Sequence, residues 1–329
     1  MKSTRKTLLF SGIAWVIGLA TFILLLKCTG KKDNNNGLAY DSLMVKPEES
    51  DLAFIVFGDW GRDGYYYQKD VAEAMGGFCD SFGGVDFIIS CGDNFQVNGV
   101  ISTSDPLWNT SFENVYSHPS LLVDWYPVLG NHDYKGNTEA EIQYASISRR
   151  WRMTDRYYSL VKEVNDSVVA RFVFIDTPPL IDYYRSNPET YPDVIKQDTA
   201  RQMQWLREVL FNADEDWLFA IGHHPVYSGS PKHGNTDDLI KSIKPIFDRS
   251  GLDFYFCGHD HDFQHLKSPG SGVEYIVTGT GATVRETGMG KNSLFSLSEP
   301  GFTIVLLKGN KMYLHFIDIN GNVKYSIIR

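Results

Sequence analysis

Short apolar runs recur along the chain from residue 51 onward, and each ends near a glycine followed by polar residues. The runs are too short for helices and are rich in Ile, Val and Phe, so they predict buried strands. Seven such runs lie at residues 53–57, 86–91, 125–129, 172–175, 217–221, 254–257 and 275–277. Between several of them lie helical stretches. Residues 197–211 form the clearest one, because their apolar side chains recur on one face.

Alternation of strands and helices predicts an α/β fold with layered sheets and helices. The end of the chain has a different pattern, in which three apolar segments at 302–307, 311–318 and 323–328 follow one another without a helix. Gly309-Asn310 and Asn320-Gly321 separate these segments, and such pairs are typical of tight hairpin turns. We therefore expect the domain to close with antiparallel strands.

The N-terminal segment, residues 1–28, predicts a membrane anchor or signal. Basic residues precede an uncharged, mainly apolar stretch at 7–26 that is long enough to span a bilayer as a helix. Lys27, Lys31 and Lys32 follow it directly, which favours an uncleaved anchor, although Cys28 keeps a lipidated signal open as the alternative. Residues 29–50 are polar and predict a linker, and residues 51–329 predict one catalytic domain.

Composition narrows the classes of partner. A net charge of −9 argues against nucleic acid as a main partner, because nucleic acid requires a basic face. It leaves a phosphorylated small molecule open, since bound metal cations can outweigh distant carboxylates. Four cysteines are too few for a disulfide scaffold, and we expect Cys91 and Cys257 to be buried thiols. With the anchor, these features predict an extracytoplasmic protein, in the periplasm, at the cell surface or in the secretory pathway. We expect a monomer.

Five polar clusters follow predicted strand ends. They are Gly58-Asp59, Gly92-Asp93-Asn94, Gly130-Asn131-His132-Asp133, Gly222-His223-His224-Pro225 and Gly258-His259-Asp260-His261. In open α/β sheets the ligand crevice lies beyond the carboxyl ends of the strands, so the five clusters could meet at one rim. Asp, Asn and His are ligands of zinc, iron and manganese, and five of the nine histidines lie in these clusters. A single Gly-Asp pair is usually a turn. The five clusters together predict a metal site.

The order and the amino-acid sequences of these clusters resemble those of the calcineurin-like metallophosphoesterases. Flanking stretches such as Gly58-Asp59-Trp60-Gly61 and Pro225-Val226-Tyr227-Ser228 look like those of the purple acid phosphatases, especially the small tartrate-resistant type. The resemblance extends from residue 51 to the C-terminus. It implies a four-layer sandwich of two packed mixed sheets flanked by helices. It also implies a hydrolase that cleaves phosphate monoesters by attack of a metal-bound hydroxide.

The resemblance also assigns roles to individual residues. Asp59 and His261 would bind the first metal, and Asp93 would bridge both metals. The second metal would be bound by Asn131, His223 and His259. The catalytic histidines would be His132 and His233, which match family residues that contact the phosphate or protonate the leaving group. For substrate binding the resemblance and position indicate Asn131, His132 and His224. The alternative for His224 is a residue in the wall of the site, and the alternative for His233 is an ordinary loop residue.

Gln96 departs from the pattern of the purple acid phosphatases. The family has an iron-ligating tyrosine three residues after the bridging aspartate, where this chain has Gln96. Gln96 is therefore a candidate for contacting a metal or one of its ligands. Loss of a tyrosinate removes an anionic ligand, so we predict two divalent ions (Fe, Zn or Mn), no purple absorption band and a pH optimum shifted towards neutral.

Two other functions are compatible with the same motifs. A phosphodiesterase or nucleotide hydrolase could use the same metal cradle, because fold alone does not determine the substrate. A non-catalytic surface protein is the third possibility, and the Gln96 replacement lends it weight. All six other ligand positions are intact, however, and a decayed site should have lost several.

Overall fold

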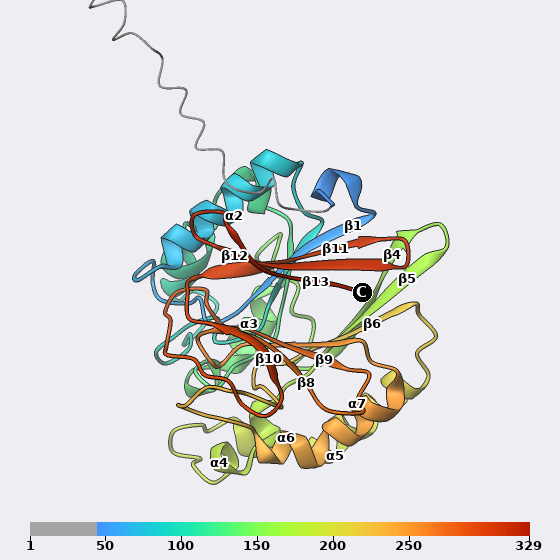
Figure 1. Cartoon of the computed structure of the whole chain (residues 1–329). Helices are drawn as coiled ribbons and strands as arrows, with labels where there is room; N and C mark the ends of the chain where they lie inside the picture. The colour runs from blue at the N-terminus through green and yellow to red at the C-terminus, as the bar shows by residue number, and fades with distance from the viewer. Residues whose placement is uncertain (1–44) are drawn as a thin grey trace, which may run out of the picture. The chain divides into compact units, whose positions relative to one another are not determined.

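The computed structural model of the chain describes residues 45–329, and its strands form two mixed sheets. The six-stranded sheet has the order β13-β12-β11-β1-β2-β3, and the seven-stranded sheet has the order β10-β8-β9-β7-β6-β5-β4 (Figure 1). The first sheet consists of β1 (Leu52–Phe57), β2 (Phe87–Ser90), β3 (Asp124–Pro127), β11 (Gly301–Lys308), β12 (Lys311–Asp318) and β13 (Val323–Ile328). The second consists of β4 (Tyr158–Asn165), β5 (Val168–Phe174), β6 (Trp217–Ile221), β7 (Phe254–Cys257), β8 (Phe263–Lys267), β9 (Glu274–Thr278) and β10 (Ser293–Leu297).

The two sheets pack face to face through aromatic side chains. Phe54 of β1 contacts Phe172 of β5 and Phe219 of β6 with ring centroids 5.2 and 5.8 Å apart, and Phe87 of β2 also contacts Phe172. Edge-to-face pairs of this kind contribute beyond their buried area. All four side chains are at most 1% exposed, so the interface between the sheets is the core of the domain.

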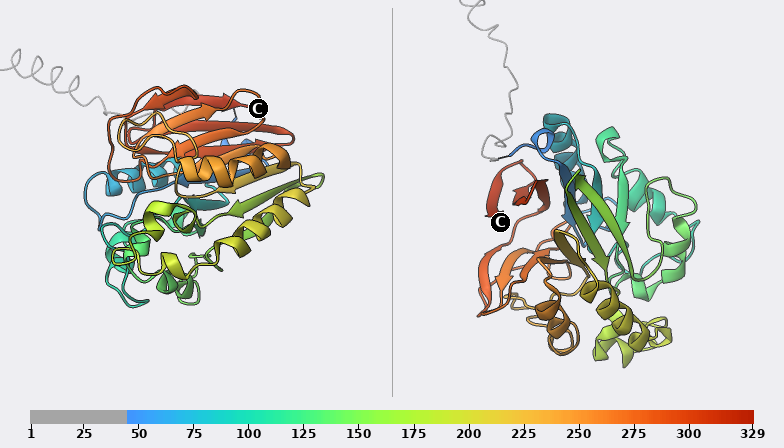
Figure 2. Two further views of the ribbon diagram at one scale, coloured as in Figure 1. Left: turned by 90° about the horizontal axis from the view of Figure 1, so that it is seen from below. Right: turned by 90° about the vertical axis from the view of Figure 1, so that its right-hand side faces the viewer.

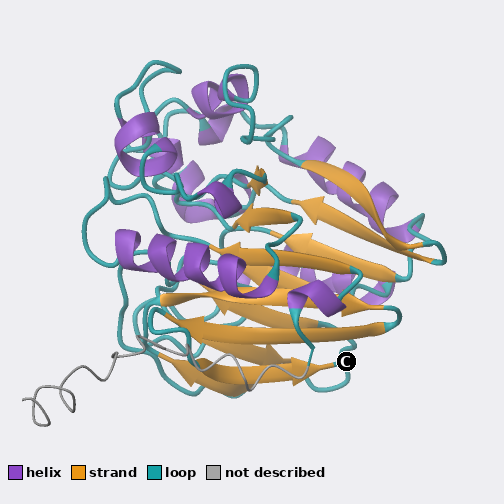
Figure 3. Cartoon of the chain, turned by 90° about the horizontal axis from the view of Figure 1, so that it is seen from above, coloured by secondary structure: helices purple, strands orange, loops and turns teal. Residues whose placement is uncertain are grey.

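Helices lie on the outer sides of the two sheets (Figures 2 and 3). They are α2 (Gln68–Phe82), α3 (Thr138–Tyr144), α4 (Asp182–Arg185), α5 (Thr199–Phe211), α6 (Asp237–Ser242) and α7 (Lys244–Ser250). Helix α2 packs against β11 of the six-stranded sheet, whereas α5, α6 and α7 pack together on the opposite side in Figure 1. This arrangement of two mixed sheets and flanking helices confirms the predicted α/β fold.

Parallel strands occupy the centre of each sheet, and this positions the site. β1, β2 and β3 run parallel to one another, as do β5, β6, β7 and β9. The carboxyl ends of each set therefore lie at one edge of its sheet. The closing segments form the predicted antiparallel strands, with Gly309-Asn310 as the two-residue turn between β11 and β12.

Three strands had not been predicted from the sequence: β4, β8 and β10. β10 lies at one edge of the seven-stranded sheet and β4 at the other, and both leave many side chains partly exposed. β8 has the sequence Phe-Gln-His-Leu-Lys, and its buried polar residues interrupt any apolar run. An apolar run is therefore a signal for central strands with apolar side chains on both faces, and it misses edge strands and an inner strand such as β8 that buries polar residues.

The predicted membrane segment and most of the predicted linker lie outside the described residues. Within residues 45–50, a short 3-10 helix spans Pro47–Glu49, and Val45 and Pro47 are buried. No helix within residues 45–329 is long and apolar enough to cross a membrane. Cys79, Cys91 and Cys257 are buried free thiols.

Candidate metal centre

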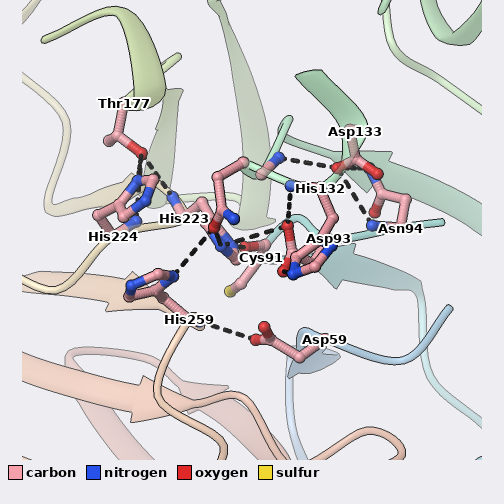
Figure 4. A network of polar contacts seen from close by, with 12 residues as sticks. Asp59, Cys91, Asp93, Asn94, His132, Asp133, Thr177, His223, His224 and His259 are labelled. Atoms are coloured by element: carbon pink, nitrogen blue, oxygen red, sulfur yellow. Dashed lines mark hydrogen bonds and ion pairs between the residues drawn. The ribbon is translucent and has the colours of Figure 1, made fainter. Parts of the chain in front are cut away.

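The five polar clusters follow strands at the carboxyl edges of the two sheets. Asp59 comes after β1, Asp93 after β2 and Asn131 after β3, whereas His223 comes after β6 and His259 after β7. Figure 4 shows Asp59 and Asp93 approaching His223 and His259 from the other sheet. Ligand-type atoms of Asp59, Asp93 and His223 lie within 4.8 Å of one another, as do those of His223, His224 and His259. The structure therefore brings residues predicted as metal ligands to one place.

Asp59 and His261, predicted for the first metal, are in contact. His261 Nε2 lies 3.3 Å from Asp59 Oδ1, and both side chains are at most 2% exposed. The other oxygen, Oδ2, accepts a hydrogen bond of 2.8 Å from the backbone N–H of His259. The second ring nitrogen of His261 contacts the hydroxyl of Thr283, which orients the imidazole so that Nε2 faces the carboxylate.

Asn131, His223 and His259, predicted for the second metal, form a second group of contacts. Asn131 Oδ1 lies 3.2 Å from His223 Nε2 and 3.1 Å from His259 Nδ1. The backbone carbonyl of Cys91 lies 2.8 Å from His223 Nδ1 and so leaves Nε2 to face the site. Three donor atoms of the kinds that bind zinc, iron or manganese thus point towards one another.

Asp93, predicted to bridge the two metals, lies between the groups. Its Oδ1 is 3.4 Å from His223 Nε2 and accepts a 2.8 Å hydrogen bond from the backbone N–H of His132. Burial works to raise the pKa of Asp93, but the nearby imidazoles of His223 and His132 and the hydrogen bond from the backbone N–H of His132 outweigh it and lower the pKa. The carboxylate also interacts electrostatically with His261, and thus with histidines of both groups.

The backbone is strained at three of these positions. Asp59, Asp93 and His259 have φ values of 60°, 51° and 67°, in the left-handed region that non-glycine residues rarely adopt. Such strain persists only where the surroundings hold it, and it clusters at functional sites. Glycines allow the close approach: a Cβ on Gly130 would lie 2.2 Å from Asp93 Oδ1, and one on Gly258 would lie 2.3 Å from Asp59 Oδ2.

Electrostatics fit a pair of cations. Burial raises the pKa of Asp59 to about 8, and Asp93 adds to this although His223 opposes it. Asp59 Oδ1 is buried and has no hydrogen-bond partner. Burial also lowers the pKa of His261 to about 3 and keeps the imidazole in the neutral form that binds metals. A cation would stabilise the buried carboxylate and satisfy its unpartnered oxygen, so the residues present fit a metal centre.

A cleft of about 730 Å³ opens beside this centre. Five of the predicted residues line it, namely Asn131, His132, His224, His233 and His259. His233 Nδ1 lies 2.6 Å from His259 Nε2, and His132 Nδ1 lies 2.7 Å from the carbonyl of Val97. Two of the six metal-ligand candidates, Asn131 and His259, thus line the cleft together with both predicted catalytic histidines.

His224 is buried in the wall of the cleft rather than free to bind a metal. Its Nδ1 lies 2.9 Å from the Thr177 hydroxyl, and its Nε2 lies 2.8 Å from the Tyr184 hydroxyl. Both ring nitrogens are therefore engaged by protein groups. Tyr184 lies on α4 and lines the cleft, as do Ile181, Tyr183 and Tyr191.

Gln96 has no hydrogen bond between its side chain and any of the predicted ligands. Its side chain is 4% exposed, and neither Nε2 nor Oε1 has a hydrogen-bond partner. Gln96 lines a second, smaller cavity, separate from the cleft that contains the histidines.

Comparison with known proteins identifies the family. The model of the calcineurin-like phosphoesterases matches residues 52–263. Purple acid phosphatase 7 of Arabidopsis thaliana is 32% identical over 289 residues, which cover 84% of this chain and 86% of that protein. Human tartrate-resistant acid phosphatase type 5 is 36% identical over 240 residues, covering 70% of this chain and 73% of the relative. The chain is a calcineurin-like phosphoesterase.

A solved structure adds a relative of a different kind. GAP50, described as the anchor in the inner membrane complex of Plasmodium, superposes with a TM-score of 0.73 and 26% identity, covering 84% of this chain and 87% of that one. The family nevertheless implies a phosphoester hydrolase with a dinuclear centre of Fe, Zn or Mn. The resemblance to purple acid phosphatases that the motifs indicated is thereby confirmed.

Sequence reasoning missed several residues around the site of this phosphoesterase. The Thr177 hydroxyl accepts hydrogen bonds from the backbone N–H groups of His223 and His224. Thr177 follows β5 closely, but no glycine precedes it, so the pattern that singled out the other clusters did not apply. Arg285 Nη1 lies 3.3 Å from His233 Nε2 and donates to the carbonyl of His259 at 3.4 Å. No signal in the sequence marks Arg285, since it lies in a long loop between β9 and β10.

Proposed function

We propose that this chain is a phosphomonoesterase in which Asp59, Asp93, Asn131, His223, His259 and His261 hold two divalent cations. The observation that carries the proposal is the meeting of carboxylate, amide and imidazole donors from both sheets beside a cleft of about 730 Å³. Purple acid phosphatases of plants and mammals supply the substrate class, since they are about one-third identical over most of the chain.

A pair of cations bound there would lower the pKa of a water molecule and neutralise the charge of the phosphate. The protein's own residues orient the reaction. Asp93, between the two groups of ligands, supplies negative charge to both. Asn131 lines the cleft, so its amide nitrogen is available to a phosphate oxygen while Oδ1 faces the histidines.

His132 and His233 serve the leaving group in this proposal. Both line the cleft, and neither is among the predicted metal ligands. His132 is fixed by contacts with the carbonyl of Val97 and with Lys135 Nζ, and His233 by contacts with His259 and Arg285. An imidazole that lines the cleft can donate a hydrogen bond to the departing oxygen once substrate displaces one of its present partners. His224 then acts as a wall whose two nitrogens are already engaged.

Gln96 supports divalent rather than trivalent cations. A neutral amide in place of a tyrosinate leaves Asp59 and Asp93 as the anionic protein ligands, and Arg62 and Arg285 add positive charge nearby. Each missing negative charge disfavours a trivalent ion more than a divalent one. We accordingly propose a pH optimum closer to neutral than that of an acid phosphatase.

Residues 1–28 are proposed to attach the protein to a membrane, with residues 29–50 as a linker and 51–329 as an extracytoplasmic catalytic domain. The sequence supports this through its apolar stretch at 7–26. The relative GAP50, an anchor in a membrane complex, supports membrane attachment by likeness. The protein is proposed to act as a monomer.

Phosphate release by the purified full chain, measured at several pH values with elemental analysis, tests the proposal. Turnover of nitrophenyl phosphate should exceed that of its bis-ester, with about two metal ions per chain. A preference for the bis-ester would favour a phosphodiesterase. Absence of turnover for both substrates in a fully metal-loaded protein would overturn the enzymatic proposal.

The second candidate function is a non-catalytic membrane anchor, and the likeness to GAP50 favours it. Two features weigh against it. The predicted ligand set retains all six side chains, and three of the residues carry backbone strain that a purely structural domain has no reason to keep. A variant lacking residues 1–44 distinguishes the two candidate functions, because hydrolysis by the truncated domain supports the phosphomonoesterase over the non-catalytic anchor.

A further inference from the structure

A second cavity of about 400 Å³ lies outside the cleft with the histidines. It is lined by Arg62, Asp63, Tyr65, Tyr66, Gln96 and Val97, from the loop after β1 and the loop after β2. These loops also carry Asp59 and Asp93, and both carboxylates act electrostatically on Arg62, so the cavity lies near the candidate metal centre. None of its lining residues is a predicted metal ligand apart from Gln96, whose role was left open.

Two side chains of this cavity have buried polar atoms that no protein group satisfies. They are Gln96, with Nε2 and Oε1 both unpartnered, and Arg62, with Nε unpartnered. Gln96 is 4% exposed. Burying an amide or guanidinium without hydrogen bonds is costly, and such groups in a folded protein call for a binding partner.

Arg62 also has no close ion-pair partner. Among residues 45–329, no carboxylate forms an ion pair with its guanidinium, whose Nε has no hydrogen-bond partner and whose carbon lies 5.6 Å from the centre of the Tyr66 ring. Asp63 is the cavity's single acidic lining residue, and its side chain is exposed to solvent. Burial lowers the pKa of Arg62, while Asp59 and Asp93 oppose this, so the guanidinium lies within electrostatic reach of the metal-ligand candidates. The cavity therefore presents a cation and an unpaired amide beside the centre.

We propose that Arg62 and Gln96 form a second anion subsite, which binds a further phosphoryl group of a substrate whose first phosphoryl group occupies the metal centre. A guanidinium recognises phosphate oxygens with a pair of charge-assisted hydrogen bonds, and the Gln96 amide adds a neutral donor. The ligand chemistry is a pyrophosphoryl group, from inorganic pyrophosphate or a nucleoside diphosphate. This inference deepens the proposed function and rests on it.

Hydrolysis of such a substrate needs no further reactant. The oxygen of water bonds to one phosphorus, and the bridging P–O bond breaks with its electron pair passing to the leaving phosphate. The protons of water pass to the leaving phosphate and to solvent. A simple monoester has no second phosphoryl group, so it gains nothing from Arg62 and Gln96 beyond long-range attraction.

Kinetics of the metal-loaded full chain test the subsite through a ratio of substrates. For Arg62→Ala, kcat/KM for pyrophosphate and for ADP should fall about tenfold or more relative to kcat/KM for nitrophenyl phosphate. Arg62→Lys, which keeps the charge, should recover part of the loss. Gln96→Leu should lower the same ratio about threefold. Arg207→Ala on α5 is the matched control, since it removes one positive charge from an exposed position and should leave the ratio unchanged.

If Arg62→Ala lowers kcat/KM by the same factor for pyrophosphate, ADP and nitrophenyl phosphate, the proposal of a subsite is wrong. The two sources of the ligand are separated by comparing pyrophosphate with ADP: a subsite for the phosphoryl group alone affects both equally. A larger effect on ADP would show that Arg62 contacts the nucleoside instead, which also contradicts the proposal.

Binding of two non-hydrolysable probes separates this inference from the proposed function. The metal-loaded chain is first freed of unbound metal. Titration calorimetry should then show that Arg62→Ala lowers the affinity for methylenediphosphonate about tenfold and the affinity for methylphosphonate less than threefold. If the protein binds the diphosphonate in this way but cleaves no ester, the proposed function fails and the subsite stands. If it cleaves nitrophenyl phosphate and Arg62→Ala weakens both probes equally, the subsite fails and the function stands.

Discussion

The six-stranded sheet contributes oxygen donors to the candidate metal centre, whereas the seven-stranded sheet contributes nitrogen donors. Asp59, Asp93 and Asn131 follow β1, β2 and β3, and the histidines follow β6 and β7. Carboxylate and amide oxygens suit manganese, and imidazoles suit zinc and iron, so the mixed set of donors requires both sheets. The centre therefore exists only where the sheets pack, through contacts such as that between Phe54 and Phe172.

The two sides also hold their donors differently. On the oxygen side, the Asp59 and Asp93 carboxylates each accept a backbone N–H, and both residues adopt a strained backbone conformation that His259 on the nitrogen side shares. On the nitrogen side, His223 and His261 are oriented by one hydrogen-bonding partner each, the Cys91 carbonyl and the Thr283 hydroxyl. Cys91 belongs to the loop after β2, so the six-stranded sheet orients a histidine of the other sheet.

Removal of the central carboxylate should give the largest effect. Asp93→Asn takes away the carboxylate predicted to bridge both cations, so we expect kcat to fall on the order of 10³-fold, which corresponds to an activation barrier higher by about 4 kcal/mol. Metal content should fall with it, as measured by elemental analysis. Asp176→Asn is the control, because Asp176 is equally buried but bonds to Tyr134 and Gln202. Unchanged metal content and hydrolysis in Asp93→Asn would refute the two-metal model.

Replacement of one ligand candidate from each sheet should remove one cation at a time. His261→Ala should cost the first metal and Asn131→Ala the second, so each variant should retain about one ion per chain. We expect kcat/KM to fall roughly 10²-fold in both, since either loss leaves an incomplete clamp on the phosphate. If one of the two variants retains both ions at full occupancy, the assignment of that residue is wrong.

Replacement of Gln96 should change the kind of metal more than the rate. Gln96→Tyr offers a phenolate, so the iron-loaded variant should absorb strongly in the visible range, and its pH optimum should move towards acid. Gln96→Phe has the same bulk without the hydroxyl and should stay colourless. Intense visible absorption by the unmodified iron-loaded protein would contradict the prediction of a site without a phenolate ligand.

A histidine far from the centre should have the smallest effect, on stability alone. Burial lowers the pKa of His315 on β12 from 6.5 to about 4. Between these values the unfolded chain binds more protons than the folded one, so stability falls as pH drops from 6.5 to 4. We expect His315 to account for roughly 1–3 kcal/mol of this loss, and His315→Asn to flatten that part of the profile. Urea unfolding at pH 4.5 and 7 measures the change in the free energy of unfolding between the two pH values. An equal change in the unmodified protein and in His315→Asn would contradict the prediction.

The ligand candidates could be found from the sequence because each follows a central strand after glycine. Burial on both faces makes such a strand a run of apolar residues, and a close backbone approach requires glycine, as at Gly130 and Gly258. Thr177 and Arg285 could not be found in this way. Their contacts with His224 and His233 join segments 47 and 52 residues apart, and no local pattern encodes such a pairing.

The sequence by itself determined the strand cores, the hairpin turns at the C-terminus and the residue types available to bind metals, since these follow from local periodicity and side-chain chemistry. Only the tertiary structure decided which donors meet, that both nitrogens of His224 are engaged, and that Arg62 and Gln96 share a cavity. The physical reason is that sheet packing brings together loops distant in the chain, and burial then sets the charge and hydrogen bonding of each side chain.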